Sequence, residues 1–411
     1  MPFLGWRVVW AAFVLAVFGW GVGFYGPPVY LHAVIERTGW ALPLVSTAVT
    51  VHFLIGAVVV ANLPALHRRF GLPTITMAGA AALGAGVLGW AIAREPWQLF
   101  AAALLSGTGW VALGAAAVNA IVAPWFVRFR PAALATAYNG ASIGGVIFSP
   151  LWVALIDSIG FARAAGAIGG VMVLTIGALS RRVFALTPER AGLLPDGDVV
   201  GVAATRVIAV RSRAVPGSAL WRDRMFLTLA TGMALGLFAQ IGLLAHLFSV
   251  LAPALGGQAA GLAMGMATGC AIAGRTIVGW LMPIGADRRL VACASLGVQA
   301  AGSAILVLSA GHSVPLLLLG VVLFGAGIGN ATSLPPMIAQ VEFVQDDAPR
   351  VVSLIVALGQ ATYAFAPALF GIARSAGPAV FDLSPGSATV AFAAAVIVQL
   401  AAIACYLAGR R

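Results

Sequence analysis

Residues 225–250 read MFLTLATGMALGLFAQIGLLAHLFSV, a run without a single Asp, Glu, Lys or Arg. About 20 apolar residues in a helix are enough to cross the hydrocarbon core of a bilayer. Hydrocarbon offers no hydrogen-bond partner to an exposed backbone, so a spanning segment of this kind must be a helix. The stretch therefore predicts a membrane-spanning helix, and two polar residues within it, Gln240 and His246, stand out.

Eleven other stretches have the same character. With the first one they predict spans near residues 8–31, 43–63, 74–93, 97–121, 132–156, 162–180, 225–250, 257–282, 289–309, 314–336, 350–373 and 387–408. A membrane barrel would show short alternating segments instead. The first run is too long for the apolar part of a signal peptide, so we expect an uncleaved first span. The predicted fold class is an all-α membrane protein with twelve transmembrane helices.

The composition supports lipid as the solvent. The chain has 411 residues, of which 61% are hydrophobic and 9% charged, against about 25% charged in a soluble domain. The mean hydropathy is +1.03. All 23 basic residues are arginine and the net charge is +11, but the arginines lie in short clusters between long apolar runs. Membrane topology explains this pattern better than phosphate contacts, so we expect no nucleic-acid partner.

The arginines also predict the orientation. With both termini cytoplasmic, eighteen arginines lie inside, four lie outside and Arg275 remains within a span. The four outer ones are Arg37, Arg94, Arg163 and Arg374. This asymmetry predicts an even number of spans in a cell (inner) membrane, with both ends cytoplasmic.

An internal repeat divides the chain. One constant offset in the numbering (287 − 67 = 220) aligns 67–69 with 287–289, 107–109 with 327–329, and 130–142 with 350–362. The same offset at three places predicts two six-helix halves of the same orientation. We expect an N-terminal half at 1–184, a cytoplasmic linker at 185–222 and a C-terminal half at 223–411.

Enzyme and metal signals are weak. Cys270, Cys293 and Cys405 lie in apolar runs without paired spacing, which predicts neither a metal site nor a disulfide framework. The G-x-S-x-G pattern at 140–144 and the G-x-G-x-x-G pattern at 84–89 both fall inside predicted helices, where the strand that each motif needs is missing. We therefore expect no enzyme activity, no cofactor and no metal.

Arg275 is the strongest candidate for function. It lies in GCAIAGRTIVGW at 269–280, where a charge costs at least about 2.5–3.5 kcal/mol and is usually functional. Asp157 and Glu342 lie only near span ends, so no acidic partner is obvious. A substrate carboxylate would supply one through two parallel hydrogen bonds from the guanidinium. The alternatives are an arginine bonded to helix carbonyls and water, or one paired with Glu342.

Three histidines, His32, His52 and His246, lie in or near predicted spans. The repeat offset places His52 on Ile272, one turn before Arg275. Histidine titrates near physiological pH, so His52 or His246 could carry a coupling proton. The alternative, a neutral histidine that bonds neighbouring helices, is the preferred interpretation for all three.

Other polar residues at mid-span depth are secondary candidates for the substrate pocket. They are Gln360 and Tyr363, which share a helix face at i, i+3 spacing, and Tyr138 and Asn139 in the matching part of span five. The alternative for each is a packing role between helices. Pro27-Pro28 should interrupt span one near its outer end.

The residues His67-Arg68-Arg69-Phe70-Gly71 resemble the loop signature of the major facilitator superfamily. A second copy stands at Asp287-Arg288-Arg289. The first copy has His67 where the signature has Asp, and the second has additional residues before Asp287. The resemblance implies gating roles in these loops for Arg68, Arg69, Asp287 and Arg288.

Finer motifs resemble the branch of monocarboxylate porters and oxalate:formate antiporters. They stand at residues 5–7, 38–40, 125–131, 188–197 and 274–275. In that branch the span-eight arginine binds the substrate carboxylate, which implies the same role for Arg275. Proton-coupled members carry an Asp where this chain has Ala271. Dicarboxylate exchangers carry a second cation in span eleven, where this chain offers Gln360 and Tyr363, and one cation fits one carboxylate.

The sequence thus predicts a monomeric secondary transporter that moves a small organic anion, preferably a monocarboxylate, by alternating access. Arg275 would neutralise the anion, while Tyr138, Asn139, His246, Gln360 and Tyr363 would shape the pocket. Proton symport or anion exchange would drive it. The alternatives are proton-coupled efflux of drugs or other hydrophobic compounds, and a non-transporting sensor or enzyme, for which no signalling segment or catalytic cluster is present in the sequence.

Overall fold

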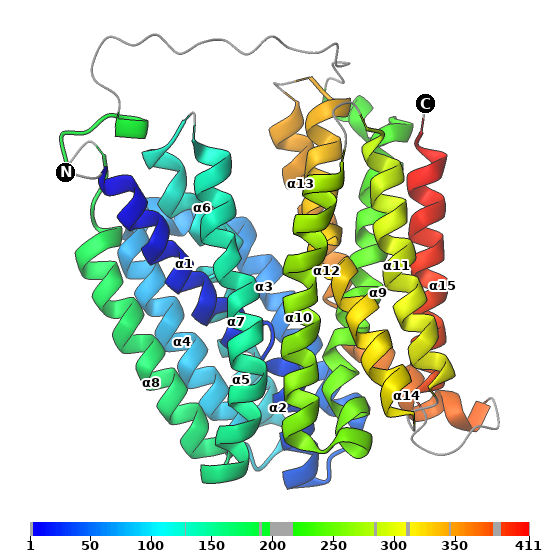
Figure 1. Ribbon diagram of the computed structural model, residues 1–411. Coiled ribbons are helices and arrows are strands. Elements are labelled where there is room, and N and C mark those ends of the chain that lie inside the picture. The colour runs from blue at the N-terminus through cyan, green and yellow to red at the C-terminus, as the bar shows by residue number, and fades with distance from the viewer. Residues whose placement is uncertain are drawn as a thin grey trace. The chain divides into compact units, whose positions relative to one another are not determined.

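The chain folds into two compact helical units, Met1–Thr205 and Arg206–Arg411. The computed structural model describes residues 3–127, 129–188, 191–197, 217–282, 286–309, 313–344, 347–380 and 388–410. Figure 1 shows the first unit in blue to green and the second in green to red. The unit boundary lies inside residues 185–222, while the limits that we assign to the two halves stay a prediction.

The N-terminal unit consists of helices joined by short turns. They are α1 (Leu4–Gly23), α2 (Pro27–Thr38), α3 (Leu42–Phe70), α4 (Leu72–Ile92), α5 (Pro96–Ala112), α6 (Ala115–Val122), η1 (Ala123–Trp125), α7 (Arg130–Ile159), α8 (Phe161–Leu179), η2 (Ser180–Phe184) and η3 (Pro195–Gly197).

The C-terminal unit repeats this plan. Its helices are η4 (Gly217–Arg222), α9 (Arg224–Leu255), α10 (Gly257–Leu281), α11 (Arg288–Leu308), α12 (Val314–Glu342), α13 (Ala348–Tyr363), α14 (Ala366–Val380) and α15 (Thr389–Ala408).

Within the described residues, twelve helical segments are long and apolar enough to cross a membrane. The predicted all-α fold with twelve spans is confirmed. The boundaries agree to within a few residues except at the ends of spans one and ten, where the helical segments continue to Thr38 and Glu342. Three spans are broken: span one into α1 and α2, span four into α5 and α6, and span eleven into α13 and α14. The break in span one leaves backbone groups that side chains satisfy.

The break in span one follows from Pro27 and Pro28. A proline has no N–H, so the carbonyl of Gly23 loses its donor four residues on. The side chain of His52 lies 2.9 Å from that carbonyl oxygen through its Nε2 and replaces the donor. One residue earlier, the carbonyl of Val22 accepts a hydrogen bond of 3.0 Å from the hydroxyl of Tyr30. The predicted interruption of span one is therefore confirmed, and side chains bridge it.

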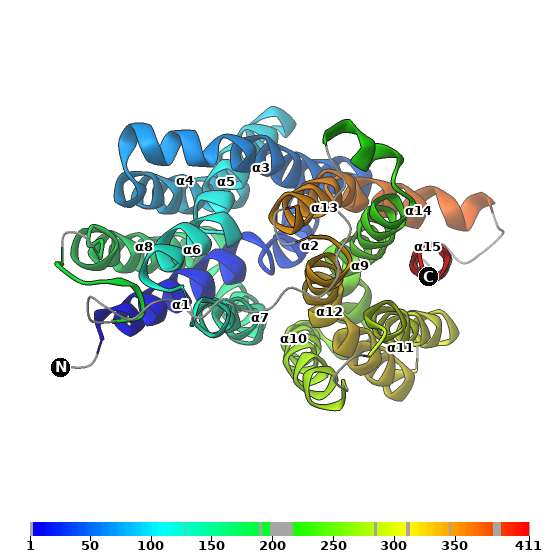
Figure 2. The same ribbon diagram turned by 90° about the horizontal axis from the view of Figure 1, so that it is seen from above.

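Small residues let the helices approach closely. In the N-terminal unit α7 packs along α1, and a Cβ on Gly140 or Gly144 would lie only 2.2 or 2.4 Å from a carbonyl oxygen of α1. The pattern that resembled a nucleophile motif is thus a helix contact. In the C-terminal unit, α10 and α12 meet along Gly325 and Gly329, which face Ala267 and Ala271. Figure 2, seen from above, shows α12 between α10 and α11. Such seams of small residues are the usual means of helix association in lipid.

A buried arginine fastens four helices where α9 begins and α15 ends. Arg289 is 2% exposed, and its Nε and Nη2 donate to the two carboxylate oxygens of Glu342 at 2.6 and 2.8 Å. Its remaining hydrogen bonds go to the carbonyl oxygens of Met225 and Tyr406 and to the hydroxyl of Thr228. One side chain thereby joins α9, α11, α12 and α15.

Asp287, which precedes Arg288 and Arg289, caps the start of α11. The carboxylate of Asp287 accepts from the backbone N–H groups of Arg289 and Leu290, and from Nε of Arg410 at 2.7 Å. Burial by itself raises the pKa of Asp287, but these hydrogen bonds and the charge of Arg410 outweigh it, so the pKa lies below its usual value. Asp287 therefore stays ionised at neutral pH and holds the chain end against α11.

The related loop in the N-terminal unit is built differently. There, α3 continues as a helix through His67 to Phe70, so the residues aligned with Asp287 and Arg289 end a helix instead of starting one. Arg69 is exposed and lies 5.1 Å above the ring of Phe70. The start of α9 is offset from that of α1 by 224 − 4 = 220, but the start of α11 is offset from that of α4 by 288 − 72 = 216. One constant offset is therefore not kept along the chain.

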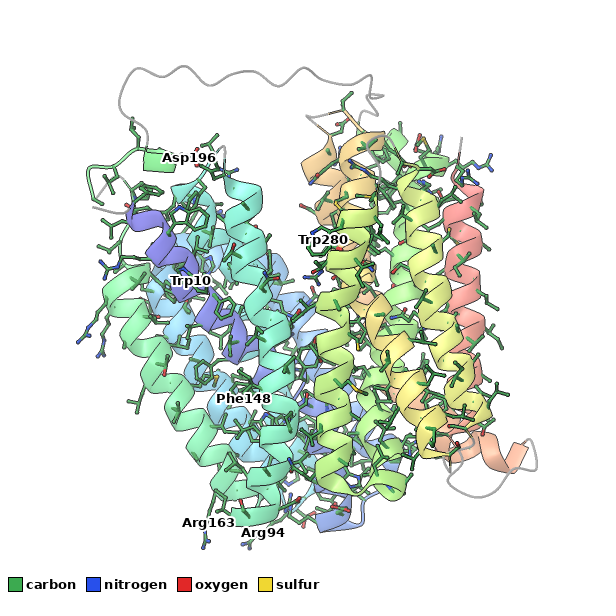
Figure 3. All side chains as sticks on the ribbon, in the orientation of Figure 1. Trp10, Arg94, Phe148, Arg163, Asp196 and Trp280 are labelled. Atoms are coloured by element: carbon green, nitrogen blue, oxygen red, sulfur yellow. The ribbon has the colours of Figure 1, made fainter. Side chains whose placement is uncertain are left out.

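An aspartate fastens the segment after η2 to the N-terminal unit. Asp196 has a positive φ of 62°, which Asp tolerates better than most residues. Its carboxylate accepts hydrogen bonds from the backbone N–H groups of Val127 (3.1 Å) and Phe129 (3.2 Å), just before α7. Figure 3 shows Asp196 at one end of this unit, and Arg94 and Arg163 at the opposite end. The negative charge thus lies at the positive end of the α7 dipole.

We expect Glu342→Gln to destabilise the C-terminal unit strongly. Removing one partner of a buried ion pair costs about 3–5 kcal/mol, because the remaining charge stays buried without compensation. The measurement is thermal unfolding of detergent-purified protein, followed by tryptophan fluorescence. The control is Arg69→Gln, which changes the exposed residue that the repeat aligns with Arg289, the partner of Glu342. This substitution should leave the unfolding temperature nearly unchanged. Equal effects of the two substitutions would contradict the assignment.

Candidate functional site

Arg275 is held by its neighbour helix. It is half-buried on α10, and its Nε donates a hydrogen bond of 3.3 Å to the carbonyl of Gly329 on α12. A Cβ on Gly329 would lie 3.1 Å from that Nε and 2.5 Å from the carbonyl oxygen of Ala271, so only glycine leaves room for this approach. The close seam between α10 and α12 therefore positions the guanidinium.

The carbonyl that binds Arg275 lies beside an irregular part of α12. It also accepts from the hydroxyls of Thr332 and Ser333, both at 3.1 Å. Just beyond, Pro335 and Pro336 lack the N–H groups that would close the helix turn. Arg275 is thus attached to the turn that precedes a proline pair.

The proposed pairing of Arg275 with Glu342 is wrong. Glu342, which ends α12, gives both carboxylate oxygens to Arg289. The bond to Gly329 agrees with the alternative in which helix carbonyls hold Arg275.

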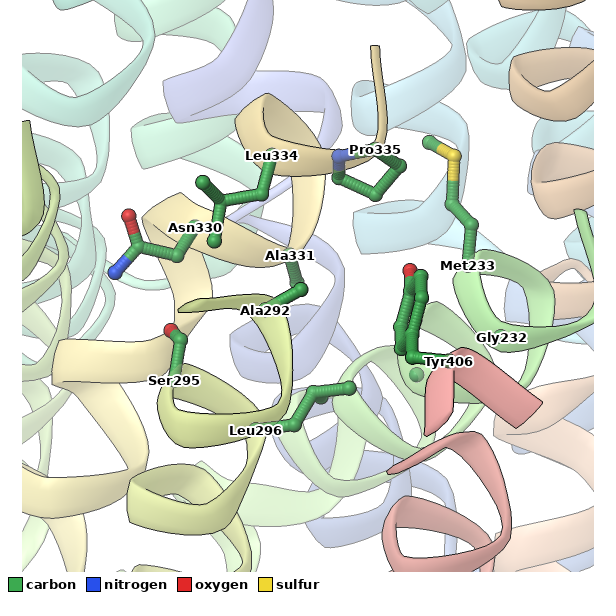
Figure 4. A pocket seen from close by; sticks show the side chains of 11 residues that line it. Gly232, Met233, Ala292, Ser295, Leu296, Asn330, Ala331, Leu334, Pro335 and Tyr406 are labelled. Carbon is green, nitrogen blue, oxygen red and sulfur yellow. The ribbon is translucent and has the colours of Figure 1, made fainter. Parts of the chain in front are cut away.

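A small pocket lies next to this region (Figure 4). It is lined by α9, α11, α12 and α15, and its polar groups come from Ser295, Asn330 and Tyr406. About 10 Å³ is open to the centre of a water-sized sphere, which is room for roughly one water molecule. The pocket therefore suits a structural water better than a substrate. Asn330 is only 2% exposed. A polar residue within an apolar run is the sequence signal that could have identified Asn330 as part of the pocket lining.

Gln360 and Tyr363 lie where span eleven breaks. Both are half-buried in the last turn of α13, and the next residues, Ala364 and Phe365, separate it from α14. The N–H of Ala364 still bonds the carbonyl of Gln360 at 3.1 Å. The two candidates therefore share a turn beside a break, as their spacing predicts.

His246 belongs to a cluster around a second arginine. It is 2% exposed, and its Nε2 lies 2.8 Å from the carbonyl of Pro367, which identifies Nε2 as the protonated nitrogen. Its Nδ1 faces Nη1 of Arg374 at 3.4 Å. Arg374, expected in an outer loop, lies in α14 and within the candidate span. Measured from the turn at Gly256, His246 and Arg275 differ in depth by about 14 Å at 1.5 Å per residue.

Tyr138 bonds the first turn of α6, beside the break in span four. Its hydroxyl donates a hydrogen bond of 3.0 Å to the carbonyl of Ala115, the first residue of α6, and also bonds the side-chain amide of Asn119. Tyr138 is half-buried, and the adjacent Asn139 is exposed on α7. Sequence reasoning identified Tyr138 but missed Asn119.

His52 is buried among three helices. Its Nε2 bonds the carbonyl of Gly23, and its Nδ1 lies 2.8 Å from the hydroxyl of Ser106. The indole of Trp90 donates to the same hydroxyl at 3.1 Å. Both ring nitrogens of His52 are therefore used by a network that ties α1 to α3, α4 and α5, as the packing alternative requires.

The helix starts do not keep the repeat offset that aligned His52 with Ile272, one turn before Arg275. His52 is the eleventh residue of α3, whereas Arg275 is the nineteenth of α10, the corresponding helix. The difference is about 12 Å along the helix axis, or two turns. The single offset failed here because the corresponding helices do not start at one constant distance along the chain.

The loop arginines also differ between the units. Arg288 donates to the carbonyl of Met337 at 2.7 Å and so joins the capped start of α11 to α12. Arg68 lies in the last turn of α3. Beside it, burial lowers the pKa of His67, whose Nε2 has no hydrogen-bond partner within the described residues. The gating role implied for Arg68, Arg69, Asp287 and Arg288 stays a prediction.

The comparisons with known proteins agree with this architecture. The family model described as Major Facilitator Superfamily matches residues 9–371. A bacterial homologue of the human lysosomal transporter Spinster, inward-facing and unoccupied, is 15% identical with a TM-score of 0.70 and covers 100% of this chain and 98% of its own. A mutant of the nucleoside transporter NupG is 11% identical with a TM-score of 0.72 and covers 98% and 100%. No curated protein sequence matches the chain. At these identities the two structures establish the fold alone.

Replacing His52 should weaken the N-terminal unit through the backbone. His52→Leu leaves the carbonyl of Gly23 without a donor, at a cost of about 1–3 kcal/mol for a buried unpaired group. We expect a lower unfolding temperature in detergent, measured by size-exclusion chromatography after heating. His32→Leu is the control, because the ion pair of His32 is with Glu36 at the helix surface. No difference between the two variants would mean that the Gly23 bond contributes nothing.

Proposed function

Because this chain belongs to the major facilitator superfamily, we propose that it is a transporter of a small organic anion, most suitably a monocarboxylate. The two halves would present a site to the two sides of the membrane in turn. We further propose that it works as a monomer in a cell (inner) membrane with both termini cytoplasmic, the topology that its arginine distribution favours.

The observation that supports an anionic cargo is the position of Arg275. It places a guanidinium within a membrane-spanning helix, and the carbonyl of Gly329 fixes its Nε. Glu342, which the sequence suggested as an alternative partner of Arg275, pairs with Arg289 instead. A carboxylate is the group that a guanidinium binds with two parallel hydrogen bonds. Arg275 would thus neutralise the substrate inside the bilayer, where an uncompensated charge is costly.

Other polar residues of the two halves stay candidates for hydrogen bonds to the cargo. They are Gln360 and Tyr363, at the break of span eleven, and Tyr138 and Asn139 on α7. His246 is a candidate only through Arg374, since its two ring nitrogens bond Pro367 and Arg374.

Of the two modes of coupling, the histidine geometry favours anion exchange over proton symport. The Nδ1 of His246 faces a guanidinium N–H, so a proton there would set two donors against each other. His52 could accept a proton only if the hydroxyl of Ser106 turned to the carbonyl of Ala103, 3.2 Å away. Exchange requires neither change.

Arg275→Gln should abolish monocarboxylate binding at the Arg275 site without unfolding the protein. A ligand that binds the folded state raises the unfolding temperature by mass action. We expect this rise for the wild type with one group of small carboxylates, measured on detergent-purified protein, and a much smaller rise for the variant.

The control is Arg163→Gln, which removes one exposed positive charge and should keep the full response. A response to cationic or neutral drugs that Arg275→Gln leaves intact would reject the anion site and favour efflux of hydrophobic compounds. Correct insertion of Arg275→Gln with undiminished carboxylate transport would have the same meaning.

Anion exchange predicts stimulation from the opposite side of the membrane. Uptake of a labelled carboxylate into proteoliposomes should be several-fold faster when the vesicles are loaded with the same unlabelled anion. A pH gradient alone should have little effect, and His52→Gln should leave that small effect unchanged. Uptake that depends on a pH gradient in the wild type and loses this dependence in His52→Gln would instead establish proton symport.

A further inference from the structure

Arg374 stands out as a charged side chain that turns into the helix bundle near the end of span eleven. Its candidate span ends at Ala376, and an arginine at such a place commonly extends toward water. Here its Nη1 instead donates to the hydroxyl of Ser249 on α9 at 2.6 Å and faces Nδ1 of the buried His246. The guanidinium is therefore held against α9.

These neighbours fix one nitrogen of the guanidinium and neutralise none of its charge. The hydroxyl of Ser249 donates to the carbonyl of His246 at 2.8 Å, so its oxygen is left to accept from Arg374. The ring of His246 gives its proton to Pro367, so Nδ1 also acts as an acceptor. Ser249 and His246 are thus both uncharged acceptors, and both contact Nη1 of Arg374.

The opposite edge of the guanidinium has no hydrogen-bond partner among the described residues. Within the described residues, every hydrogen bond of Arg374 uses Nη1, and the buried Nε has no partner. No carboxylate of the described residues pairs with Arg374. The Nε–Nη2 edge carries two parallel N–H groups, which match the two oxygens of a carboxylate or a phosphodiester.

The helix that carries Arg374 is anchored from the same side. Phe370, one turn earlier, packs its ring 5.9 Å from that of Phe238 on α9, and a Cβ on Gly242 would lie 2.4 Å from the Phe370 ring. This contact holds the start of α14 on α9, so the arginine has a defined position. An anion would find a preorganised donor pair there.

We propose that Arg374, positioned by Ser249 and His246, forms a second oxyanion-binding site in the C-terminal unit. The site differs from that of Arg275 in depth by about 14 Å, as its partner His246 does. It also lies past the break in span eleven, about 21 Å along the helix from Gln360. Its ligand is a monoanion with two adjacent oxygens, supplied either as a soluble carboxylate or as a lipid phosphodiester.

The test uses the Arg275→Gln background, which isolates the second site. Full-length Arg275→Gln and the double variant with Arg374→Gln are purified in a neutral detergent. Binding is measured by thermal unfolding and calorimetry, with sodium pyruvate in one arm and phosphatidylglycerol micelles in the other. We expect Arg275→Gln to bind one of the two probes. The double variant should bind that probe at least about tenfold more weakly.

The arm that responds identifies the source of the oxyanion. A pyruvate response that needs Arg374 indicates a soluble anion, and a phosphatidylglycerol response that needs Arg374 indicates a lipid. If both probes bind Arg275→Gln and the double variant equally, or bind neither, the site does not exist and Arg374 only ties α14 to α9. Binding of pyruvate to Arg374→Gln alone tests Arg275 separately, so the proposed function and this site can fail independently.

Two further variants protect the test from a folding defect. Arg374→Lys keeps the charge but loses the paired N–H edge, and should fold while binding the responding probe several-fold more weakly. Ser249→Ala keeps the arginine but releases Nη1, and should weaken binding by a smaller factor. Unchanged affinity in both variants would overturn the proposal.

Discussion

A helix in hydrocarbon has no water to replace a backbone hydrogen bond that the sequence has removed, and the polar contacts around the break in span one answer that constraint. Pro27 deprives Gly23 of a donor, and His52 supplies one from α3. Beside the break in span four, the hydroxyl of Tyr138 donates an additional hydrogen bond to the carbonyl of Ala115. These side chains look like site residues when read from the sequence, yet each has a backbone group to satisfy. A polar residue within a span must therefore be judged after the breaks of the neighbouring helices have been located.

The sequence predicted the twelve spans because apolar length is a local property that each stretch carries by itself. It also predicted the break at Pro27, since a missing N–H is independent of tertiary structure. The partner of Glu342 could not be predicted, because Arg289 is distant along the chain and the sequence offered Arg275 equally well. Arg374 was assigned to an outer loop because a charge near a span end shortens the apolar run, although the helix continues past it.

The two units share a helical plan but differ in how their loops are held. Asp287 starts α11 and caps it, while the aligned His67 is the fourth residue from the end of α3. The capped loop brings Arg289 inside the bundle, and the uncapped one leaves Arg69 on the surface. The two copies of the loop motif differ by His67 in place of Asp287 and by a small change in loop length. With these differences, Arg289 crosslinks helices while Arg69 is an exposed charge. Sequence similarity within a repeat does not ensure the same contacts.

The network around Arg289 has a consequence for which substitutions each arginine tolerates. Its five N–H groups point in fixed directions and all of them are used, by acceptors on α9, α12 and α15. A lysine offers three donors from a single point and could not reach these acceptors together. At exposed Arg69, which lies above the ring of Phe70, lysine would keep the charge and the ring contact. In a chain whose basic residues are all arginine, geometry thus requires that residue at one of these positions and leaves the other position open to lysine.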